Sequence, residues 1–135
     1  MREIKFRGKR IANGEWVYGD LLQGLYGDVY IVITHENGVT KYEVQNETLG
    51  QYTGIKDSKG RRIFEGDILS VLGSFNQKGM LTNFHVEYVE KKGAFGMLLE
   101  AGDFVSVASL FKVRGLETDV VITGNIHDNP ELKKK

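Results

Sequence analysis

The chain has 135 residues, 18 basic and 18 acidic side chains and no cysteine, and these numbers exclude several classes of protein. A content of 41% hydrophobic and 27% charged residues is an ordinary balance for a globular domain. A formal net charge of zero argues against a protein that coats nucleic acid, because such proteins are normally basic. The lack of cysteine excludes disulfides, thiol catalysis, iron–sulfur clusters and thiolate zinc sites.

No segment predicts export or membrane insertion. Residues 1–7 are charged and lack the apolar core of a signal peptide. The longest apolar run, Val29 to Ile33, is far shorter than the roughly 20 residues that span a bilayer. The only proline is Pro130, and no Ser- or Gly-rich linker marks a domain boundary. We therefore expect a single domain over residues 1–135, located in the cytoplasm.

Composition and turn signals predict a mostly β fold. Val and Ile together outnumber Ala by 22 to 4, and branched Cβ atoms favour strands over helices. Turn signals separate the apolar segments in chain order at Asn13-Gly14, Asn37-Gly38, Asp57-Ser58-Lys59-Gly60 and Lys91-Lys92-Gly93. The pair Asn37-Gly38 lies between segments 28–34 and 39–44. It predicts a two-residue type I′ hairpin, because both positions of that turn need φ > 0.

The later segments also predict strands and corners. Asp57 to Gly60 reads as a type I turn with Gly60 in the left-handed position. In the corner Glu65-Gly66-Asp67, the carboxylate of Asp67 is expected to accept backbone N–H groups of the turn. Residues 82–90 and 94–99 predict a hairpin. Residues 119–126 are apolar on both faces, which predicts a strand that is central or closes a barrel. Residues 104–111 fit both a short helix and a strand.

Residues 48–69 carry the most distinctive pattern in the chain. The segment includes Gln51-Tyr52-Thr53-Gly54-Ile55-Lys56-Asp57 and Ile63-Phe64-Glu65-Gly66-Asp67-Ile68-Leu69. It resembles the signature of the YopX family, small proteins that bacteriophages and prophages encode. The end of the chain, Gly124-Asn125-Ile126-His127-Asp128-Asn129-Pro130-Glu131-Leu132, is similar to that family's closing motif, and residues 2–8 and 16–19 are similar to its start. Phe64 and Leu69 stand where the family usually has Tyr and Val, which conserves size and apolarity.

The resemblance implies a fold and a host, but no reaction. It implies a small SH3-like β-barrel core, elaborated with extra hairpins and with at most one or two short helices. A corner of the type Glu65-Gly66-Asp67 before an aliphatic strand is common where such barrels begin a strand. The implied setting is the cytoplasm of a bacterial host cell, and no biochemical activity is established for the family.

The residues do not predict an enzyme. Asp57 and Asp67 are expected to cap turns rather than to form a catalytic pair. His35, His85 and His127 lack the spacing of metal ligands, so we expect no metal site. Neither a phosphate-binding loop nor a G-x-S-x-G elbow occurs, and we expect no cofactor.

Two interpretations of function follow. The first is a non-catalytic protein-interaction module that forms a homo-oligomer or binds a phage or host protein, because strand-rich domains must cover their edges. Trp16 and Tyr18 share one side of an expected strand and could anchor such a contact, although a lone Trp is more often part of a core. The alternative is a nucleic-acid-binding barrel with these residues: Tyr52, Lys56, Lys59, Arg61 and Arg62.

Overall fold

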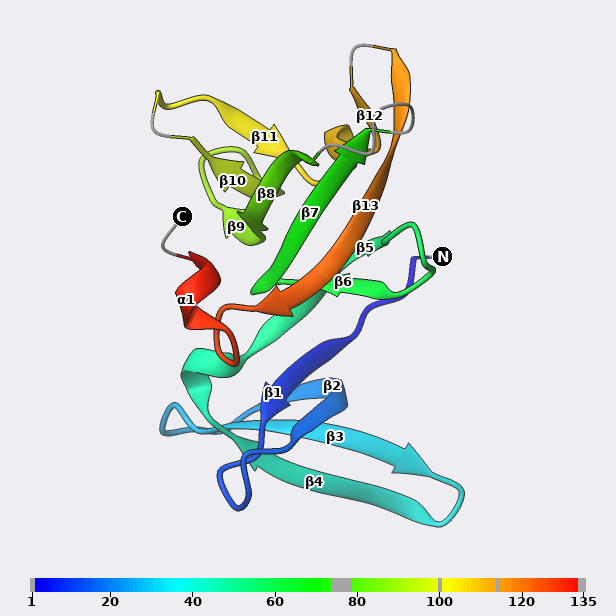
Figure 1. The fold of residues 1–135 in the computed structure, drawn as a ribbon. Helices are drawn as coiled ribbons and strands as arrows, with labels where there is room; N and C mark the ends of the chain where they lie inside the picture. The colour runs from blue at the N-terminus through cyan, green and yellow to red at the C-terminus, as the bar shows by residue number, and fades with distance from the viewer. Residues whose placement is uncertain (1, 74–78, 100, 114, 134–135) are drawn as a thin grey trace. The chain divides into compact units, whose positions relative to one another are not determined.

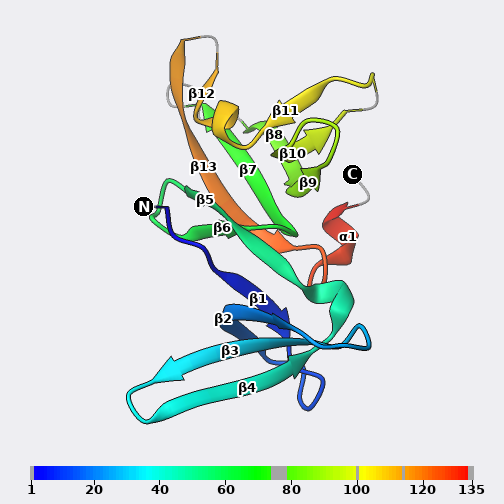
Figure 2. The same ribbon diagram turned by 180° about the vertical axis from the view of Figure 1, so that it is seen from behind.

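A computed structural model describes residues 2–73, 79–99, 101–113 and 115–133 of the chain (Figures 1 and 2). Most of these residues lie in antiparallel strands, which confirms the prediction of a mostly β fold. Contacts between residues group the chain into two compact units, Met1–Gly54 and Ile55–Lys135. The single domain expected over residues 1–135 stays a prediction.

The first unit is built on one antiparallel sheet (Figure 1). Its elements are β1 (Phe6–Lys9), β2 (Trp16–Gln23), β3 (Val29–His35), β4 (Gly38–Val44), the short 3₁₀ helix η1 (Asn46–Thr48) and the first residues of β5 (Gly50–Lys56). The strand order is β4-β3-β2-β1-β5, so the first four strands are joined as successive hairpins and β5 returns beside β1.

Alternation along the strands gives this sheet a core face. Val29, Ile31 and Val44 are buried, and Leu21 packs against them. Leu21 lies opposite Ile31, and Val29 lies opposite Val44, so these side chains share one face. The residues that alternate with these core residues along β2, β3 and β4 therefore lie on the opposite face of the sheet, the outer face.

The sheet bends until the end of β1 meets the end of β4. Arg10 forms a single bridge with Val44, and the amide of Ile11 donates to the carbonyl of Glu43 at 3.1 Å. Gly8 permits this approach, because a Cβ atom there would lie 2.8 Å from a methyl carbon of Val44. One bridge does not continue the sheet, and the described strands form no closed barrel of the expected SH3-like kind.

The hairpin between β3 and β4 differs from the sequence prediction. Its two loop residues are Glu36 and Asn37, and His35 pairs with Gly38. Gly38 has φ = 134°, but Glu36 and Asn37 do not have positive φ. Among the described non-glycine residues, positive φ occurs at Asn83. The predicted type I′ turn over Asn37-Gly38 is therefore wrong, because the loop begins one position earlier and lacks the two positive φ angles of that turn. The observed register places Val44 opposite Val29 in the core, and this packing outweighs the preference of the Asn-Gly pair.

The second unit contains two further antiparallel sheets (Figure 2). Its elements are β6 (Arg62–Phe64), β7 (Asp67–Gly73), β8 (Gly79–His85), β9 (Glu87–Val89), β10 (Ala94–Leu98), β11 (Phe104–Ser106), η2 (Ala108–Phe111), β12 (Lys112–Val113), β13 (Leu116–Asn125) and α1 (Pro130–Lys133). The strand orders are β12-β13-β7-β8 and β11-β10-β9. By strand order β13 lies between β12 and β7, but β12 pairs only with Leu116 and Glu117, so the strand predicted over 119–126 pairs with β7 along one side.

Two segments of this unit show why local pattern was insufficient. The strand expected over 82–90 is divided at Val86, whose N–H donates to the carbonyl of Asp67 and whose C=O accepts the amide of Gly66. Residues 104–111 contain both expected structures, because β11 ends at Ser106 and η2 follows. The hydroxyl of Ser106 accepts the amide of Ser109 at 3.2 Å, which favours this change.

The core of the second unit includes residues from both of its sheets. Fully buried members are Ile63, Leu69, Phe84, Val107 and Val120, and Phe95 and Met97 pack against them. Among the described residues, no helix is long and apolar enough to cross a membrane.

Candidate functional site

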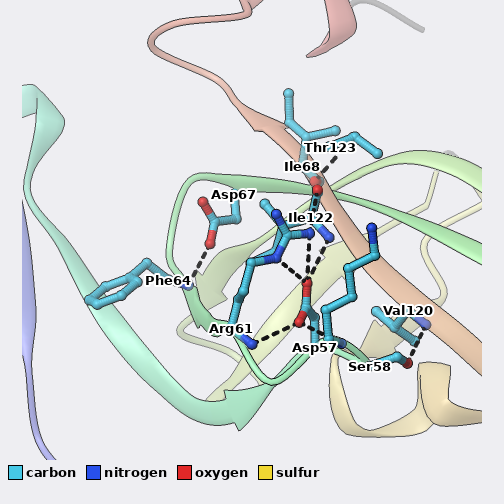
Figure 3. A network of polar contacts seen from close by, with 10 residues as sticks. Asp57, Ser58, Arg61, Phe64, Asp67, Ile68, Val120, Ile122 and Thr123 are labelled. Carbon is cyan, nitrogen blue, oxygen red and sulfur yellow. Dashed lines mark hydrogen bonds and ion pairs between the residues drawn. The ribbon is translucent and has the colours of Figure 1, made fainter.

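The loop between β5 and β6 is organised around the carboxylate of Asp57 (Figure 3). The Asp57 side chain is fully buried. One of its oxygens accepts the backbone amides of Lys59 and Arg61, each at 2.9 Å. The other accepts the Nε–H of Arg61 at 3.0 Å and the amide of Ile122 at 3.2 Å. The sequence prediction that Asp57 caps a turn is confirmed.

These contacts decide the ionisation of Asp57. Burial by itself would raise the pKa of this carboxyl, because it disfavours the charged form. The hydrogen bonds from Arg61 and Ile122 outweigh burial and lower the pKa below its ordinary value of 3.8. Asp57 is therefore held as a carboxylate whose bonding positions are filled by the fold, which is unlike a general base that awaits a substrate proton.

The same loop covers one edge of β13. Ser58 donates its amide to the carbonyl of Val120 at 2.8 Å, and its hydroxyl accepts the amide of Val120 at 2.8 Å. Arg61 donates from Nη2 to the carbonyl of Ile122 at 2.9 Å. Because β12 pairs only with the first two residues of β13, the loop satisfies backbone groups that β12 leaves uncovered.

The Gly66-Asp67 corner joins segments that are distant in the sequence. Asp67 is buried, and its carboxylate accepts the amide of Phe64 at 2.7 Å (Figure 3), which confirms the predicted turn role. Gly66 donates to the carbonyl of Val86 at 2.8 Å and accepts the amide of Ile126 at 2.9 Å. Gly60 and Gly66 have φ = 82° and 92°, as turns of these shapes require.

The closing motif is a turn of the same structural kind. The side-chain oxygen of Asn125 accepts the amides of His127 and Asp128 at 3.0 and 2.8 Å. Asn129 accepts the amide of Asn125, and a Cβ atom at Gly124 would lie 2.4 Å from the side-chain oxygen of Asn129. The distinctive polar residues of the second unit thus bond mainly to backbone groups.

The residues of the predicted nucleic-acid site differ in their environments. Tyr52 belongs to the first unit and is only 6% exposed, so its ring does not offer a stacking face. Lys56, Lys59, Arg61 and Arg62 are exposed in segment 56–62 of the second unit, and Arg61 is also bound to Asp57. The structure therefore does not place Tyr52 as an exposed platform beside the four basic side chains.

The histidines lie in separate places. His35 contacts the hydroxyl of Thr40 at 2.9 Å, and His85 lies 3.7 Å from Glu87. His127 follows Asn125 in the closing turn. Within the part of the chain that the structure describes, no group of three or more His, Cys, Asp or Glu side chains could hold a metal ion.

The turn between β2 and β3 is a site that sequence reasoning missed. Leu25 is 93% exposed and Tyr26 is 95% exposed, which is unusual for two adjacent large apolar residues. The sequence signal was present as two large apolar residues between Gly24 and Gly27. A turn that shows such residues to solvent is typical of a contact surface rather than of a solvated loop.

Asp28 holds this turn in one shape. Gly24 donates its amide to the backbone carbonyl of Asp28 at 2.8 Å, and the Asp28 carboxylate accepts the amide of Tyr26 at 3.3 Å and the hydroxyl of Tyr30 at 2.6 Å. The bond from Tyr30 lowers the pKa of Asp28 and raises the pKa of Tyr30. From η1, Asn46 donates to the carbonyl of Gly27 at 3.0 Å. Leu25 and Tyr26 therefore lie on a braced turn.

The outer face of the sheet carries further exposed apolar residues. Tyr18 and Leu22 of β2 lie on it and are each 43% exposed. Trp16 lies on the same side of β2 and is half-buried, with the guanidinium of Arg7 4.6 Å from its ring centroid. Trp16 is therefore neither a member of the core cluster nor an open anchor, whereas Tyr18 is accessible.

Comparison with known proteins identifies the family. A family model described as YopX protein matches residues 5–134, nearly the whole chain. The chain belongs to the YopX family. A solved structure described as protein EF1440 from Enterococcus faecalis is similar to this YopX-family chain at 21% identity and a TM-score of 0.54. The match covers 98% of this chain and 99% of that one. This likeness supports a shared fold. No curated protein matches the sequence.

Proposed function

We propose that this YopX-family protein is a non-catalytic protein-interaction module of a bacteriophage or prophage, acting in the cytoplasm of the host cell. The observation that carries the proposal is the braced turn that exposes Leu25 at 93% and Tyr26 at 95%. Aromatic side chains on a fixed turn bind partners at a low entropic cost, because the backbone is already ordered before contact.

The environment of the acidic residues supports a role without catalysis. Asp57 and Asp67 accept hydrogen bonds from the turns that contain them. Catalytic carboxylates need a position facing the substrate and a pKa close to the working pH, and the lowered pKa of Asp57 is the opposite arrangement.

The alternative function, nucleic-acid binding through the loop 56–62, has weaker support. The exposed Lys56, Lys59 and Arg62 favour it. The burial of Tyr52 and the zero net charge disfavour it. The two functions differ in their response to salt, because phosphate contacts release counterions and an apolar contact does not.

A capture experiment with the tagged full chain tests the proposal. The wild type, the double variant Leu25→Ser/Tyr26→Ser and the control Lys91→Ser are incubated with nuclease-treated extract of host cells that also make an untagged copy. We expect a protein, either the untagged copy or another, that the wild type and Lys91→Ser retain at high salt and the double variant loses. Gel-shift titration with single- and double-stranded DNA and RNA accompanies the capture, and we expect no binding at low salt.

Two results would contradict the proposal. If the double variant captures as much protein as the wild type, the turn with Leu25 and Tyr26 is not the binding contact. Salt-sensitive binding of DNA or RNA that Lys56→Ala/Lys59→Ala/Arg62→Ala abolishes would support the nucleic-acid function instead.

A further inference from the structure

We propose that a second copy of this chain covers the outer face of the first unit, and that the protein is a homodimer formed through this face. The inference rests on the proposed interaction function and names the partner of the same site. The face is defined by five apolar side chains and is called the outer apolar face: Tyr18, Leu22, Leu25, Tyr26 and Val39.

The register of the strands places Tyr18, Leu22 and Val39 on one face of the sheet, and Leu25 and Tyr26 follow Leu22 in the turn to β3. Leu22 of β2 lies opposite Tyr30 of β3, and Thr34 of β3 lies opposite Val39 of β4. Each of these positions alternates with a core residue, so its side chain lies on the side away from Ile31 and Val44. Val39 is 64% exposed, which extends the accessible apolar surface across the sheet from β2 to β4.

The size of this surface fits a protein contact. A fully exposed Tyr such as Tyr26 offers on the order of 200 Å² of surface for burial. A standard interface takes about 800 Å² from each partner, and the five apolar side chains with their charged neighbours supply area of that order. Bracing of Leu25 and Tyr26 by Asp28 reduces the ordering cost of binding.

The charges on the same face favour a second copy as the occupant. In one row across the sheet, Asp20 lies opposite Val32, and Val32 lies opposite Lys41. Acid and base thus stand on either side of an apolar residue. A two-fold axis through such a row brings Asp20 of each copy to Lys41 of the other, so this row is complementary to itself. A face of one sign would repel its copy.

Nearby contacts hold Lys41 in place for this pairing. Its Nζ lies 4.8 Å from the ring centroid of Tyr30, so the ammonium is directed over the outer face. Tyr30 in turn donates its hydroxyl to Asp28 of the braced turn. The basic side chain, the aromatic ring and the turn are therefore one connected surface.

Sedimentation equilibrium of the purified full chain over a wide concentration range tests the proposal, with circular dichroism as the check of folding. We expect a reversible dimer whose dissociation constant rises at least about tenfold in Leu25→Ser/Tyr26→Ser. Asp20→Lys and Lys41→Asp should each weaken the dimer by a similar factor, and the double reversal Asp20→Lys/Lys41→Asp should restore it. Glu90→Lys and Lys91→Asp, exposed charge reversals in the second unit, should leave it unchanged.

The outcomes separate this inference from the proposed function. A wild type that stays monomeric at the highest concentration, or a dimer that none of the outer-face variants weakens, overturns the inference. If the purified chain is monomeric while capture of another protein still depends on Leu25 and Tyr26, the interaction function stands and the second copy is the wrong partner. If capture and dimer are both independent of these residues, both proposals fail.

Discussion

Single residues decide where the chain can approach itself closely. Gly8 and Gly124 both lie where a Cβ atom would meet another side chain, Val44 for one and Asn129 for the other. The sequence marked Gly124 because it stands in a distinctive motif. Gly8 also lies in a motif, at the start of the chain, but the sequence did not predict its close approach to Val44, because Val44 is distant in the chain and only the bend of the sheet brings it near.

Gly8→Ala is predicted to destabilise the protein. The added methyl group would lie 2.8 Å from a carbon of the Val44 side chain, which is 2% exposed and has little room to move. Overpacking of this kind costs about 2 kcal/mol of unfolding free energy. Urea denaturation measures the loss.

Gly14→Asn is the matched control in the same unit. A Cβ atom at Gly14 meets nothing within 4 Å, and Asn tolerates its φ of 73°. We expect a change within about 0.5 kcal/mol. Equal losses in the two variants would show that the contact with Val44 is unimportant.

At the scale of elements, the sequence predicted which segments are strands better than how they pair. The strand over 119–126 was recognisable because both of its faces are apolar, and its residues lie in β13 beside β7. The hairpin after His35 was misplaced by one residue because turn preference is local and the pair Val29–Val44 is not. The turn residues of loop 57–61 were recognisable in the sequence, but its bonds to the edge of β13 were not. Ser58 and Val120 are 62 positions apart, so no local pattern connects them.

Ser58→Ala is predicted to expose the edge of β13. The amide of Val120 loses the hydroxyl that accepts its proton at 2.8 Å, and a buried amide without an acceptor costs about 1–2 kcal/mol. Hydrogen exchange followed by NMR should show the Val120 amide exchanging about tenfold faster, the factor that ~1.4 kcal/mol corresponds to. Lys59→Ala, whose side chain is exposed, should leave this rate unchanged. Unchanged exchange in Ser58→Ala would mean that the loop does not protect the strand.

Across the whole molecule, two sets of residues have different tasks. The distinctive polar residues of the second unit hold distant segments together, and the exposed apolar residues of the first unit are proposed to bind. The first task was partly predictable, because Asp and Gly in turns have recognisable spacings. The second was not, because exposure of Leu25 and Tyr26 depends on the fold around them and not on their identity.

The central claim is that the most distinctive acid of the sequence, Asp57, serves folding. Its pKa is lowered in the folded protein, so its stabilising effect is fully present above the unfolded pKa and is lost as pH falls through the lower folded pKa. Asn at this position removes the charge and turns amide hydrogens toward donors such as the backbone N–H of Arg61.

Urea unfolding of the wild type, Asp57→Asn and the control Asp119→Asn, repeated from neutral to acidic pH, tests this claim most directly. Asp119 is an exposed acid on the same strand as Ile122, so its variant controls for the lost charge. We predict that Asp57→Asn lowers the free energy of unfolding by about 2 kcal/mol at neutral pH. The difference from the wild type should shrink as pH falls below 3.8. An Asp57→Asn variant as stable as Asp119→Asn, or a difference that does not change with pH, would contradict the account.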